Sequence, residues 1–462
     1  MSETIKVYSP YDNHFINEVP LVGEREIEKA LRVAHETFVD RSNWLPKFKR
    51  IEILENLITL MKNKIPELTK IAAEEGGKPY TDSLIEVERA INGVKLGIEY
   101  LGQMKGEEVP MELTRSSEHR LAFTIKEPIG VVVSLSAFNH PLNLAIHQTI
   151  PAIATGCPVI IKPATKTPLS CFNLVNLFYE AGLPKNWCQT FVCTNELAEK
   201  LATDSRVRYL SFIGSAKVGW YLRSKLAPGT HCALEHGGAA PVIVEPDADL
   251  VSLIPALVKG GMYHAGQVCV KVQRIYIHES SMKNFSKQFT ERVKALRTGD
   301  PLDKNTDVGP LIDPKEVTRM EAWVKEAKES GAEILCGGKR LSNTCFEPTV
   351  ILNPPANVRV SCEEVFGPIV CLYTYSDRSE AIARANNVPY AFQAAICTKN
   401  IDVAFDTAKR LNAKAVMIND HTAFRVDWMP FGGKNHSGIG VGGIPYTMTE
   451  MMEDKLLVFK SA

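Results

Sequence analysis

Residues 129–161 read IGVVVSLSAFNHPLNLAIHQTIPAIATGCPVII, and this stretch decides the fold. The apolar, β-branched segments 129–135 and 158–161 are typical of buried strands, whereas residues 141–155 between them favour a helix. A helix that connects two buried strands is the unit from which parallel sheets are built. The stretch therefore predicts an α/β fold with a largely parallel sheet.

The same alternation of strand and helix extends in both directions along the chain. Two amphipathic helices are predicted upstream, around 27–38 and 51–71. Downstream, short apolar strands are predicted at 189–193, 209–213, 241–244, 274–278, 370–375, 394–398 and 416–419, and helices near 168–181, 196–202, 216–226 and 249–263. The pattern predicts two doubly wound α/β units, with the ligand site in a cleft between them.

Composition and charge exclude several classes of protein. The 462 residues exceed what one hydrophobic core usually serves, and 45% hydrophobic with 23% charged residues is typical of a folded globular protein. The 53 basic and 53 acidic residues cancel, which disfavours nucleic acid and membrane partners and leaves a small molecule as the expected ligand. No apolar run approaches the roughly 18 residues of a membrane helix, so a cytoplasmic location is expected.

One of the eleven cysteines stands apart from the others. The set is odd in number and lacks CxxC pairs or His-rich spacing, so no metal site is predicted and most thiols are expected to be reduced and buried. Cys269, in HAGQVCVKVQR, lies in a loop before a predicted strand, where a side chain can face a cleft. A nucleophilic thiol needs a base or a positive field, and Glu235 in ALEHGG is the candidate base. From the residues alone, a packed core thiol at Cys269 and a solvated loop carboxylate at Glu235 remain as alternatives.

A glycine turn offers a weaker signal for a nucleotide. In FIGSAKVG, Gly214 and Ser215 lie between a predicted strand and a predicted helix, where phosphate groups can approach a helix N-terminus. The segment lacks GxGxxG spacing, and a glycine at such a turn is most often only a turn residue.

Taken together, the motifs resemble the aldehyde dehydrogenase superfamily, over nearly the whole chain. Any one of them is weak, but their joint order and spacing are specific. They are SAFNHP (136–141), VIIKPATKTPLS (159–170), FIGSAKVG (212–219), LEHGG (234–238), AGQVC (265–269), EEVFGP (363–368) and MPFGGKNHSGIG (429–440).

The resemblance implies a fold and an activity. The implied activity is NAD(P)-dependent oxidation of an aldehyde to a free acid through a cysteine thiohemiacetal and a thioester. Cys269 would be the nucleophile, its backbone N–H and the Asn139 side-chain amide would hold the oxyanion, and Glu235 would activate the hydrolytic water. The implied architecture has a cofactor-binding domain (1–108 and 129–236), a catalytic domain (237–440) and a β-arm (109–128 and 441–462) that joins subunits into a homodimer or homotetramer.

The cofactor residues also follow from the resemblance. Lys162 would bind the adenosine ribose, Gly214 and Ser215 the pyrophosphate, and Glu364 with Phe366 the nicotinamide ribose and ring. Position 165 is often a glutamate in NAD-preferring relatives. Here it is Thr165, which removes repulsion against a 2′-phosphate, so NADP is plausible and NAD stays open.

The substrate is less well defined by the sequence. By resemblance, the entrance to the thiol is lined by His140, Leu144, His147, Val268, Val270 and the loop 420–429. Arg425 would either grip an anionic or hydroxyl group of a short polar aldehyde or pair with Asp420 or Asp427 to hold the loop. The residues around Arg425 and His147 are most similar to family members that oxidise lactaldehyde, which makes a small 2-hydroxyaldehyde the first choice. Semialdehydes and sulfo- or phospho-aldehydes are the alternatives.

Two departures from the family pattern bear on the chemistry. His236 replaces a common leucine beside Glu235, where it would change the pKa or mobility of the base. Lys271 is unusual two residues after the thiol, and a solvent-facing side chain is expected for it. A coenzyme A-acylating enzyme and a non-catalytic binding protein remain as other classes. The presence of Glu235 disfavours the former, and the complete set of Cys269, Glu235 and Asn139 disfavours the latter.

Overall fold

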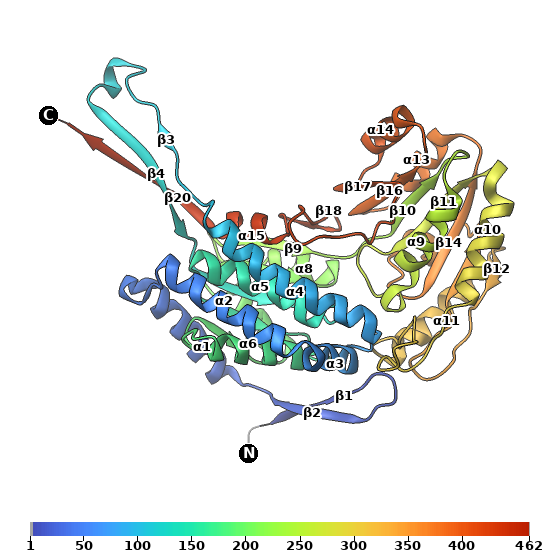
Figure 1. The fold of residues 1–462 in the computed structure, drawn as a ribbon, viewed down its shortest axis with the longest axis horizontal. Coiled ribbons are helices and arrows are strands. Elements are labelled where there is room, and N and C mark those ends of the chain that lie inside the picture. Colours follow the sequence, from blue (N-terminus) through green and yellow to red (C-terminus); the bar gives the residue numbers. More distant parts are fainter. Residues whose placement is uncertain (1–2, 462) are drawn as a thin grey trace.

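Two largely parallel sheets form the body of the molecule, and a third sheet projects from it (Figure 1). The computed structural model describes residues 3–461. The first sheet has the order β19-β9-β8-β5-β6-β7, with bounds β5 (Val131–Leu135), β6 (Val159–Lys162), β7 (Cys188–Thr190), β8 (Val207–Ile213), β9 (His231–Glu235) and β19 (Gly438–Ile439). All its pairings are parallel except that of β19 with β9.

Strand β5 shows why this sheet is covered on both faces. Val131 and Val133 pack into the core beneath α1 (Glu24–Val39) and α7 (Asn195–Thr203), whereas Val132, between them, packs into the opposite core. Successive side chains of a strand point to opposite faces, so a continuous apolar strand needs a helical layer on each side. The predicted strand-helix-strand unit of 129–161 is confirmed as β5, α5 (Pro141–Thr155) and β6.

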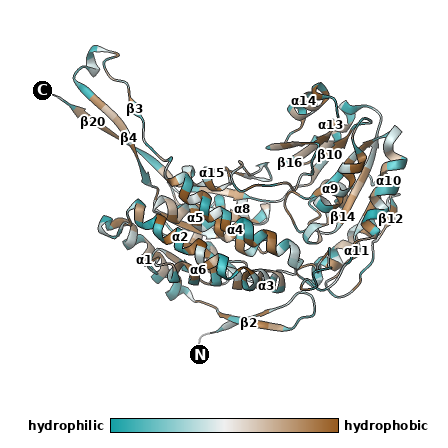
Figure 2. Cartoon of the chain, in the orientation of Figure 1, coloured by the Kyte–Doolittle hydropathy of each residue, from teal (hydrophilic) through white to brown (hydrophobic). Residues whose placement is uncertain are grey.

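A group of helices covers the second face of this sheet. They are α2 (Lys47–Asn63), α3 (Ile65–Gly76), α4 (Tyr80–Leu101), α6 (Leu169–Glu180) and α15 (Ile444–Glu450). Together with α5 they enclose one core, to which Leu57, Val94 and Ile150 contribute side chains with no exposed surface. Figure 2 shows hydrophobic and hydrophilic segments alternating along these helices, as expected for elements that bury one side.

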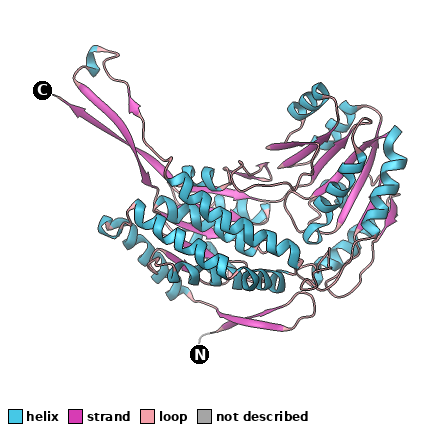
Figure 3. Cartoon of the chain, viewed as in Figure 1, coloured by secondary structure: helices cyan, strands magenta, loops and turns pink. Residues whose placement is uncertain are grey.

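The second sheet contains seven strands in the order β12-β13-β14-β11-β10-β16-β17. Its strands are β10 (Ala240–Val244), β11 (Val272–His278), β12 (Glu333–Cys336), β13 (Thr349–Leu352), β14 (Ile369–Tyr375), β16 (Gln393–Cys397) and β17 (Ala415–Ile418). The helices around it are α9 (Leu250–Met262), α10 (Glu279–Lys294), α11 (Pro314–Glu329), α12 (Arg359–Cys362), α13 (Arg378–Asn386) and α14 (Ile401–Arg410). Figure 3 shows these strands enclosed by helices. Helix α8 (Ala216–Arg223) packs instead on β9 of the first sheet.

The projecting sheet joins two distant parts of the chain. Strand β4 (Arg120–Pro128) pairs antiparallel with β20 (Met452–Lys460) over its whole length, and β3 (Glu108–Val109) adds to the other edge of β4. The tail was expected to enter this arm from residue 441. Residues 444–450 instead form α15, which packs on α4 and α5, so the strand begins only at Met452. The arm's role between subunits stays a prediction.

The remaining elements are small. They are a hairpin of β1 (Thr4–Tyr8) and β2 (Phe15–Pro20), the pair β15 (Tyr390–Ala391) with β18 (Lys434–Asn435), and the 3-10 turns 41–43, 115–117 and 263–266. Across residues 3–461, no helix combines the length and apolar character needed to span a membrane.

Candidate active site

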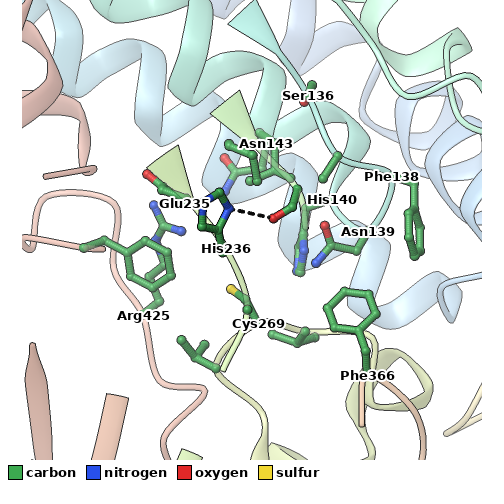
Figure 4. Close-up of a pocket in the computed structure, with 18 of the residues that line it drawn as sticks. Ser136, Phe138, Asn139, His140, Asn143, Glu235, His236, Cys269, Phe366 and Arg425 are labelled. Carbon is green, nitrogen blue, oxygen red and sulfur yellow. Dashed lines mark hydrogen bonds between the residues drawn. The ribbon is translucent and has the colours of Figure 1, made fainter. Parts of the chain in front are cut away.

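A cavity of about 410 Å³ lies between the two sheets and collects residues from both (Figure 4). The predicted residues that line it are Asn139, His140, Leu144, Gly214, Ser215, Glu235, Val268, Cys269, Val270, Glu364, Phe366 and Arg425. Lys162, Thr165 and His147 do not line it. One cavity therefore brings together most residues that the motifs predicted, although they are far apart in the sequence.

Cys269 lies in the loop between α9 and β11, with its side chain partly exposed to the cavity. Three earlier residues of the same loop, His264, Ala265 and Gly266, have φ angles of 51°, 53° and 68°. A Cβ on Gly266 would lie 2.1 Å from the main-chain oxygen of Gly367, so the turn demands glycine there. Burial raises the pKa of Cys269 to about 12, an effect that Arg425 opposes. The resting thiol is therefore protonated and needs a base.

Glu235 ends strand β9 and lines the same cavity. Burial raises the pKa of its carboxyl, and the nearby charges of Arg425 and Lys414 oppose this rise. A Cβ on Gly442 would lie 2.1 Å from Glu235 Oε1, so the glycine provides the space that the carboxylate occupies. A carboxylate with a raised pKa is a better proton acceptor than an exposed one, which is the property a general base requires.

Asn139 lies two residues before the start of helix α5, and its side chain is bonded to the loop that carries the thiol. Its Nδ2 donates to the main-chain oxygen of Gln267 at 3.0 Å, two residues before Cys269. An amide has two N–H donors, so this bond leaves one to meet a developing negative charge. The residue is 7% exposed and belongs to the cavity lining.

A buried ion pair holds Asn139 from behind. Lys78 Nζ pairs with Glu86, and the same ammonium donates to the main-chain oxygen of Asn139 at 3.3 Å. The second oxygen of Glu86 accepts the backbone N–H groups of Leu142 and Asn143, both at 2.9 Å. The first N–H groups of a helix have no acceptor within the helix itself. The Glu86 carboxylate therefore holds both Lys78 and the N-terminus of α5 in place.

The predicted nicotinamide residues form a second part of the cavity. Glu364 has a buried carboxylate whose Oε1 lacks a partner among the described residues, and burial raises its pKa to about 7. A Cβ on Gly237 would lie 1.6 Å from that oxygen, so glycine is required beside it. Phe366 packs edge-on against Phe138, with ring centroids 5.9 Å apart. An unpartnered acceptor beside a flat apolar wall fits a ribose hydroxyl next to an aromatic ring.

The residues predicted to bind the adenosine ribose and the pyrophosphate lie at the ends of strands β6 and β8. Lys162 ends β6, and its Nζ lies 3.5 Å from Thr165 Oγ1. Burial lowers the pKa of Lys162. Gly214 and Ser215 precede helix α8, and the main-chain N–H of Gly214 donates to the main-chain oxygen of Glu235 at 3.1 Å. This bond links the turn to the strand that carries the candidate base.

His236 contributes to this link rather than to the base itself. Its Nδ1 lies 2.9 Å from the main-chain oxygen of Gly214, and its ring packs between Phe212 and Trp220. A Cβ on Gly219 would lie 2.0 Å from the ring, so α8 needs a glycine to accommodate it. Figure 4 marks the hydrogen bond of the His236 ring with a dashed line.

The expectation of a solvent-facing Lys271 was wrong. The residue is 2% exposed, and its Nζ donates to the main-chain oxygens of Gly367 at 2.8 Å and Ile369 at 2.5 Å. Burial lowers its pKa to about 7. Its contacts stabilise the segment that follows Phe366.

Arg425 lines the cavity without a carboxylate partner. Its guanidinium carbon lies 3.5 Å from the ring centroid of Phe431, and NH2 lies 3.3 Å from His147 Nδ1. Within residues 3–461, no carboxylate oxygen lies within 4 Å of it, so pairing with Asp420 or Asp427 is not its role. Asp427 is occupied by Arg89, at 2.7 Å, and by His147 Nε2, at 2.8 Å.

His147 therefore lies behind Arg425 rather than in the cavity wall. Because Nε2 faces a carboxylate and Nδ1 faces a guanidinium, the ring donates from Nε2 and accepts at Nδ1. Burial and the charge of Arg425 lower its pKa to about 4, which fits a neutral ring. His140, in contrast, lines the cavity and contacts the hydroxyl of Tyr263.

Several cavity residues escaped the sequence analysis: Arg89, Asn143, Tyr263 and Phe431. Arg89 lies on α4, a helix that was not predicted. Asn143 carried a usable signal, because it is a polar residue within the apolar run PLNLAI and lies four residues after Asn139.

Comparison with known proteins supports the same interpretation. The family model described as aldehyde dehydrogenase family matches residues 1–457. This chain belongs to the aldehyde dehydrogenase family.

Individual family members are similar over almost the full length. A 3-sulfolactaldehyde dehydrogenase of Priestia aryabhattai is 36% identical, covering 99% of this chain and 95% of that protein. A lactaldehyde dehydrogenase of Methanocaldococcus jannaschii is also 36% identical, covering 99% and 97%. The crystal structure of glyceraldehyde-3-phosphate dehydrogenase GapN from the same organism, complexed with NADP, superposes with a TM-score of 0.94 at 35% identity and covers all of both chains.

These matches settle the coarser predictions for this aldehyde dehydrogenase family member. The fold class is confirmed, as is the enzyme class, an NAD(P)-dependent oxidoreductase acting on aldehydes. The individual substrate and the role of each site residue stay predictions.

Proposed function

We propose that this enzyme oxidises a short aldehyde with an anionic end group to the free carboxylic acid, using NADP or NAD. The supporting observation is the partly buried Arg425, which has no carboxylate partner among residues 3–461 and lines the cavity that also contains Cys269, Glu235 and Asn139. A guanidinium that faces a cavity without a counter-ion can bind an anion, and a substrate carboxylate, sulfonate or phosphate would supply one.

The first chemical step uses three of these residues. Cys269 Sγ attacks the aldehyde carbon while Glu235 takes the thiol proton, giving a tetrahedral thiohemiacetal whose oxygen carries the negative charge. Asn139 Nδ2 and the backbone N–H of Cys269 donate to this oxygen. Because these amides are neutral and fixed in place, they stabilise the charge without reorganising.

The nicotinamide cofactor fits the residues that the cavity presents. Glu364, Phe366, Gly214 and Ser215 line its inner part, and Lys162 with Thr165 lies at the outer end. When bound, the cofactor supplies the acceptor for the hydride that leaves the substrate carbon. Glu235 passes the thiol proton to solvent and then takes a proton from water, which attacks the thioester. The carboxylic acid leaves, and the Cys269 thiolate takes the proton back from Glu235.

The absence of an acidic side chain at residue 165 favours NADP over NAD. Thr165 Oγ1 and Lys162 Nζ lie 3.5 Å apart and offer a donor and a cation to a 2′-phosphate. The NADP complex of the similar M. jannaschii enzyme supports this choice.

A substrate series tests the proposal. The anionic aldehydes 3-sulfolactaldehyde and glyceraldehyde 3-phosphate are expected to have kcat/KM values about 10- to 100-fold above that of lactaldehyde. Arg425→Gln is expected to remove this preference, and Arg425→Lys to restore it in part. Equal values for charged and neutral substrates in the unsubstituted enzyme would reject the anionic class and favour lactaldehyde, which the lactaldehyde dehydrogenase relative supports as second candidate.

The free-acid product separates this proposal from a coenzyme A-acylating activity. Nicotinamide reduction is expected without coenzyme A. Glu235→Gln is expected to slow both the first turnover and the steady-state rate, because the same carboxylate deprotonates the thiol and activates the water. Reduction that strictly needs coenzyme A would favour the acylating class. Cofactor binding without any reduction would favour a non-catalytic protein.

We also propose that the projecting sheet joins subunits into a homodimer or homotetramer. Strand β20 exposes Leu456, Val458 and Phe459, each more than half accessible in the single chain. An exposed apolar strand at a sheet edge is a pairing surface. Val458→Asp is expected to lower the molar mass measured by light scattering after gel filtration, and an unchanged mass would remove the arm from the interface.

A further inference from the structure

Asn143 lines the cavity and has a buried amide oxygen without a partner among the described residues. The residue lies in the first turn of α5 and is 2% exposed. Its Nδ2 donates to Asp427 Oδ1 at 3.3 Å. Because a carboxylate only accepts hydrogen bonds, the nitrogen must face Asp427 and Oδ1 must point the other way. Among the described residues no donor reaches this Oδ1, although Asn143 belongs to the cavity lining.

The neighbours of Asn143 place it between the two ends of the substrate site. Asn139, four residues earlier, is bonded to the loop that carries the candidate nucleophile. His147, four residues later on the same face of α5, contacts Arg425. Asn143 therefore lies between the group that would hold the aldehyde oxygen and the group that would hold the anionic end.

A ligand that pairs with Asn143 Oδ1 must supply a hydrogen-bond donor. A hydroxyl donates one hydrogen bond and accepts others, so it can meet the oxygen of Asn143. The buried Nε of Arg425 is a donor that likewise lacks a partner among residues 3–461, and it lines the same cavity. An ammonium group would also donate, but the positive charges of Arg89 and Arg425 in the cavity wall disfavour a cation.

We propose that Asn143 Oδ1 accepts a hydrogen bond from a hydroxyl on the carbon next to the aldehyde, so that the enzyme selects 2-hydroxyaldehydes over aldehydes lacking that group. This inference rests on the proposed aldehyde oxidation and narrows its substrate class. It separates a sulfo- or phospho-lactaldehyde type of substrate from a semialdehyde, since both carry an anion but only the former carries the hydroxyl.

Two matched substrate pairs test the inference in the unsubstituted enzyme. Lactaldehyde against propanal, and 3-sulfolactaldehyde against 3-sulfopropanal, differ only in the 2-hydroxyl. The hydroxylated member of each pair is expected to have a kcat/KM about 100-fold higher, because its analogue leaves a buried acceptor unpaired. A ratio near one in both pairs would overturn the inference while leaving aldehyde oxidation intact. Failure to reduce NADP or NAD with any aldehyde would instead reject the proposed function.

Substitution of Asn143 then tests whether this residue causes the preference for the 2-hydroxyl group. Asn143→Leu is expected to bring the lactaldehyde-to-propanal ratio close to one, with the larger loss on lactaldehyde. Asp427 keeps Arg89 and His147 as partners, so the fold is expected to persist. If Asn143→Leu does not fold, Asn143→Ala is measured instead, and the same fall in the lactaldehyde-to-propanal ratio is expected. A ratio that stays high in the folded variant would overturn the assignment.

Discussion

Buried polar groups differ between the wall of the cavity, formed by the residues that line it, and the layer behind, formed by the residues that these contact. In the layer behind, Lys78 pairs with Glu86, and Asp427 holds both Arg89 and His147. In the wall, Glu364 Oε1, Asn143 Oδ1 and Arg425 Nε lack partners among the described residues. Buried polar atoms are normally paired, so unpaired atoms gathered in one cavity indicate places kept for ligands.

This difference separates stability from activity. Substitutions of the wall groups that lack partners are expected to change rates and substrate choice with little effect on unfolding, because these atoms make no internal hydrogen bond. Substitutions in the layer behind are expected to destabilise the fold, because they leave a charge buried without its partner.

The largest expected effect is in the wall, at the nucleophile. Cys269→Ala is expected to lower turnover by roughly four orders of magnitude or more, since no other group in the mechanism bonds to the substrate carbon. Cofactor binding, followed by fluorescence titration, and the thermal midpoint are expected to stay unchanged. Aldehyde oxidation that persists in this variant would remove the thiol from the mechanism.

The layer behind gives the second largest effect, on stability. Lys78→Met leaves Glu86 buried without its cation and is expected to lower the free energy of unfolding by about 3–5 kcal/mol, measured by chemical denaturation. The double variant Lys78→Met/Glu86→Leu is the control, and it is expected to recover part of the loss because both charges are gone. A single variant as stable as the original protein would contradict a supporting role for the pair.

The same ion pair explains a limit of the sequence analysis. The predicted strands of both sheets agree with β5–β8, β10, β11, β14, β16 and β17, because their short apolar runs indicate strands and, except at the edge strand β17, burial. Helix α4 was not predicted. It buries the carboxyl-bearing Asp82 and Glu86 among its apolar residues, and their cationic partners Lys259 and Lys78 lie outside the helix. Charged residues on the buried face disguise the apolar periodicity.

Long-range partners likewise limited the prediction of the site. The motifs identified residues that the fold brings into one cavity, because each motif carries its own local turn. Lys271 was misjudged since its acceptors, the main-chain oxygens of Gly367 and Ile369, are almost a hundred residues away. His147 was expected to meet the substrate, but Asp427 and Arg425, from the loop near the C-terminus, enclose it.

A smaller effect is expected at the residue that joins the two layers. Asn139 has its side chain in the wall and its main-chain oxygen on Lys78. Asn139→Ala removes one oxyanion donor and is expected to reduce kcat by about 100- to 1000-fold, or on the order of 3 kcal/mol, with KM nearly unchanged. Steady-state kinetics measure this split. A rise in KM alone would mean that the amide serves substrate binding and not the tetrahedral adduct.

The smallest expected effect is a shift in pH dependence. Glu235 must be ionised to accept a proton, and burial raises its pKa while Lys414 and Arg425 oppose the rise. Lys414, which does not line the cavity, donates to the main-chain oxygen of Gly440. Lys414→Met removes one opposing charge, so the pKa of Glu235 rises further and the ascending limb of the kcat profile moves to higher pH.

The shape of that profile distinguishes electrostatics from a structural defect. The rate of Lys414→Met is expected to fall on the acid side and to match that of the unsubstituted enzyme on the alkaline plateau, where Glu235 is ionised in both. Lys409→Met, on the outer helix α14 and absent from the charges that act on Glu235, is the matched control and is expected to leave the profile in place. A loss of rate that is uniform across pH would show that Lys414 acts through the fold, and that the field at Glu235 is set by groups lining the cavity itself.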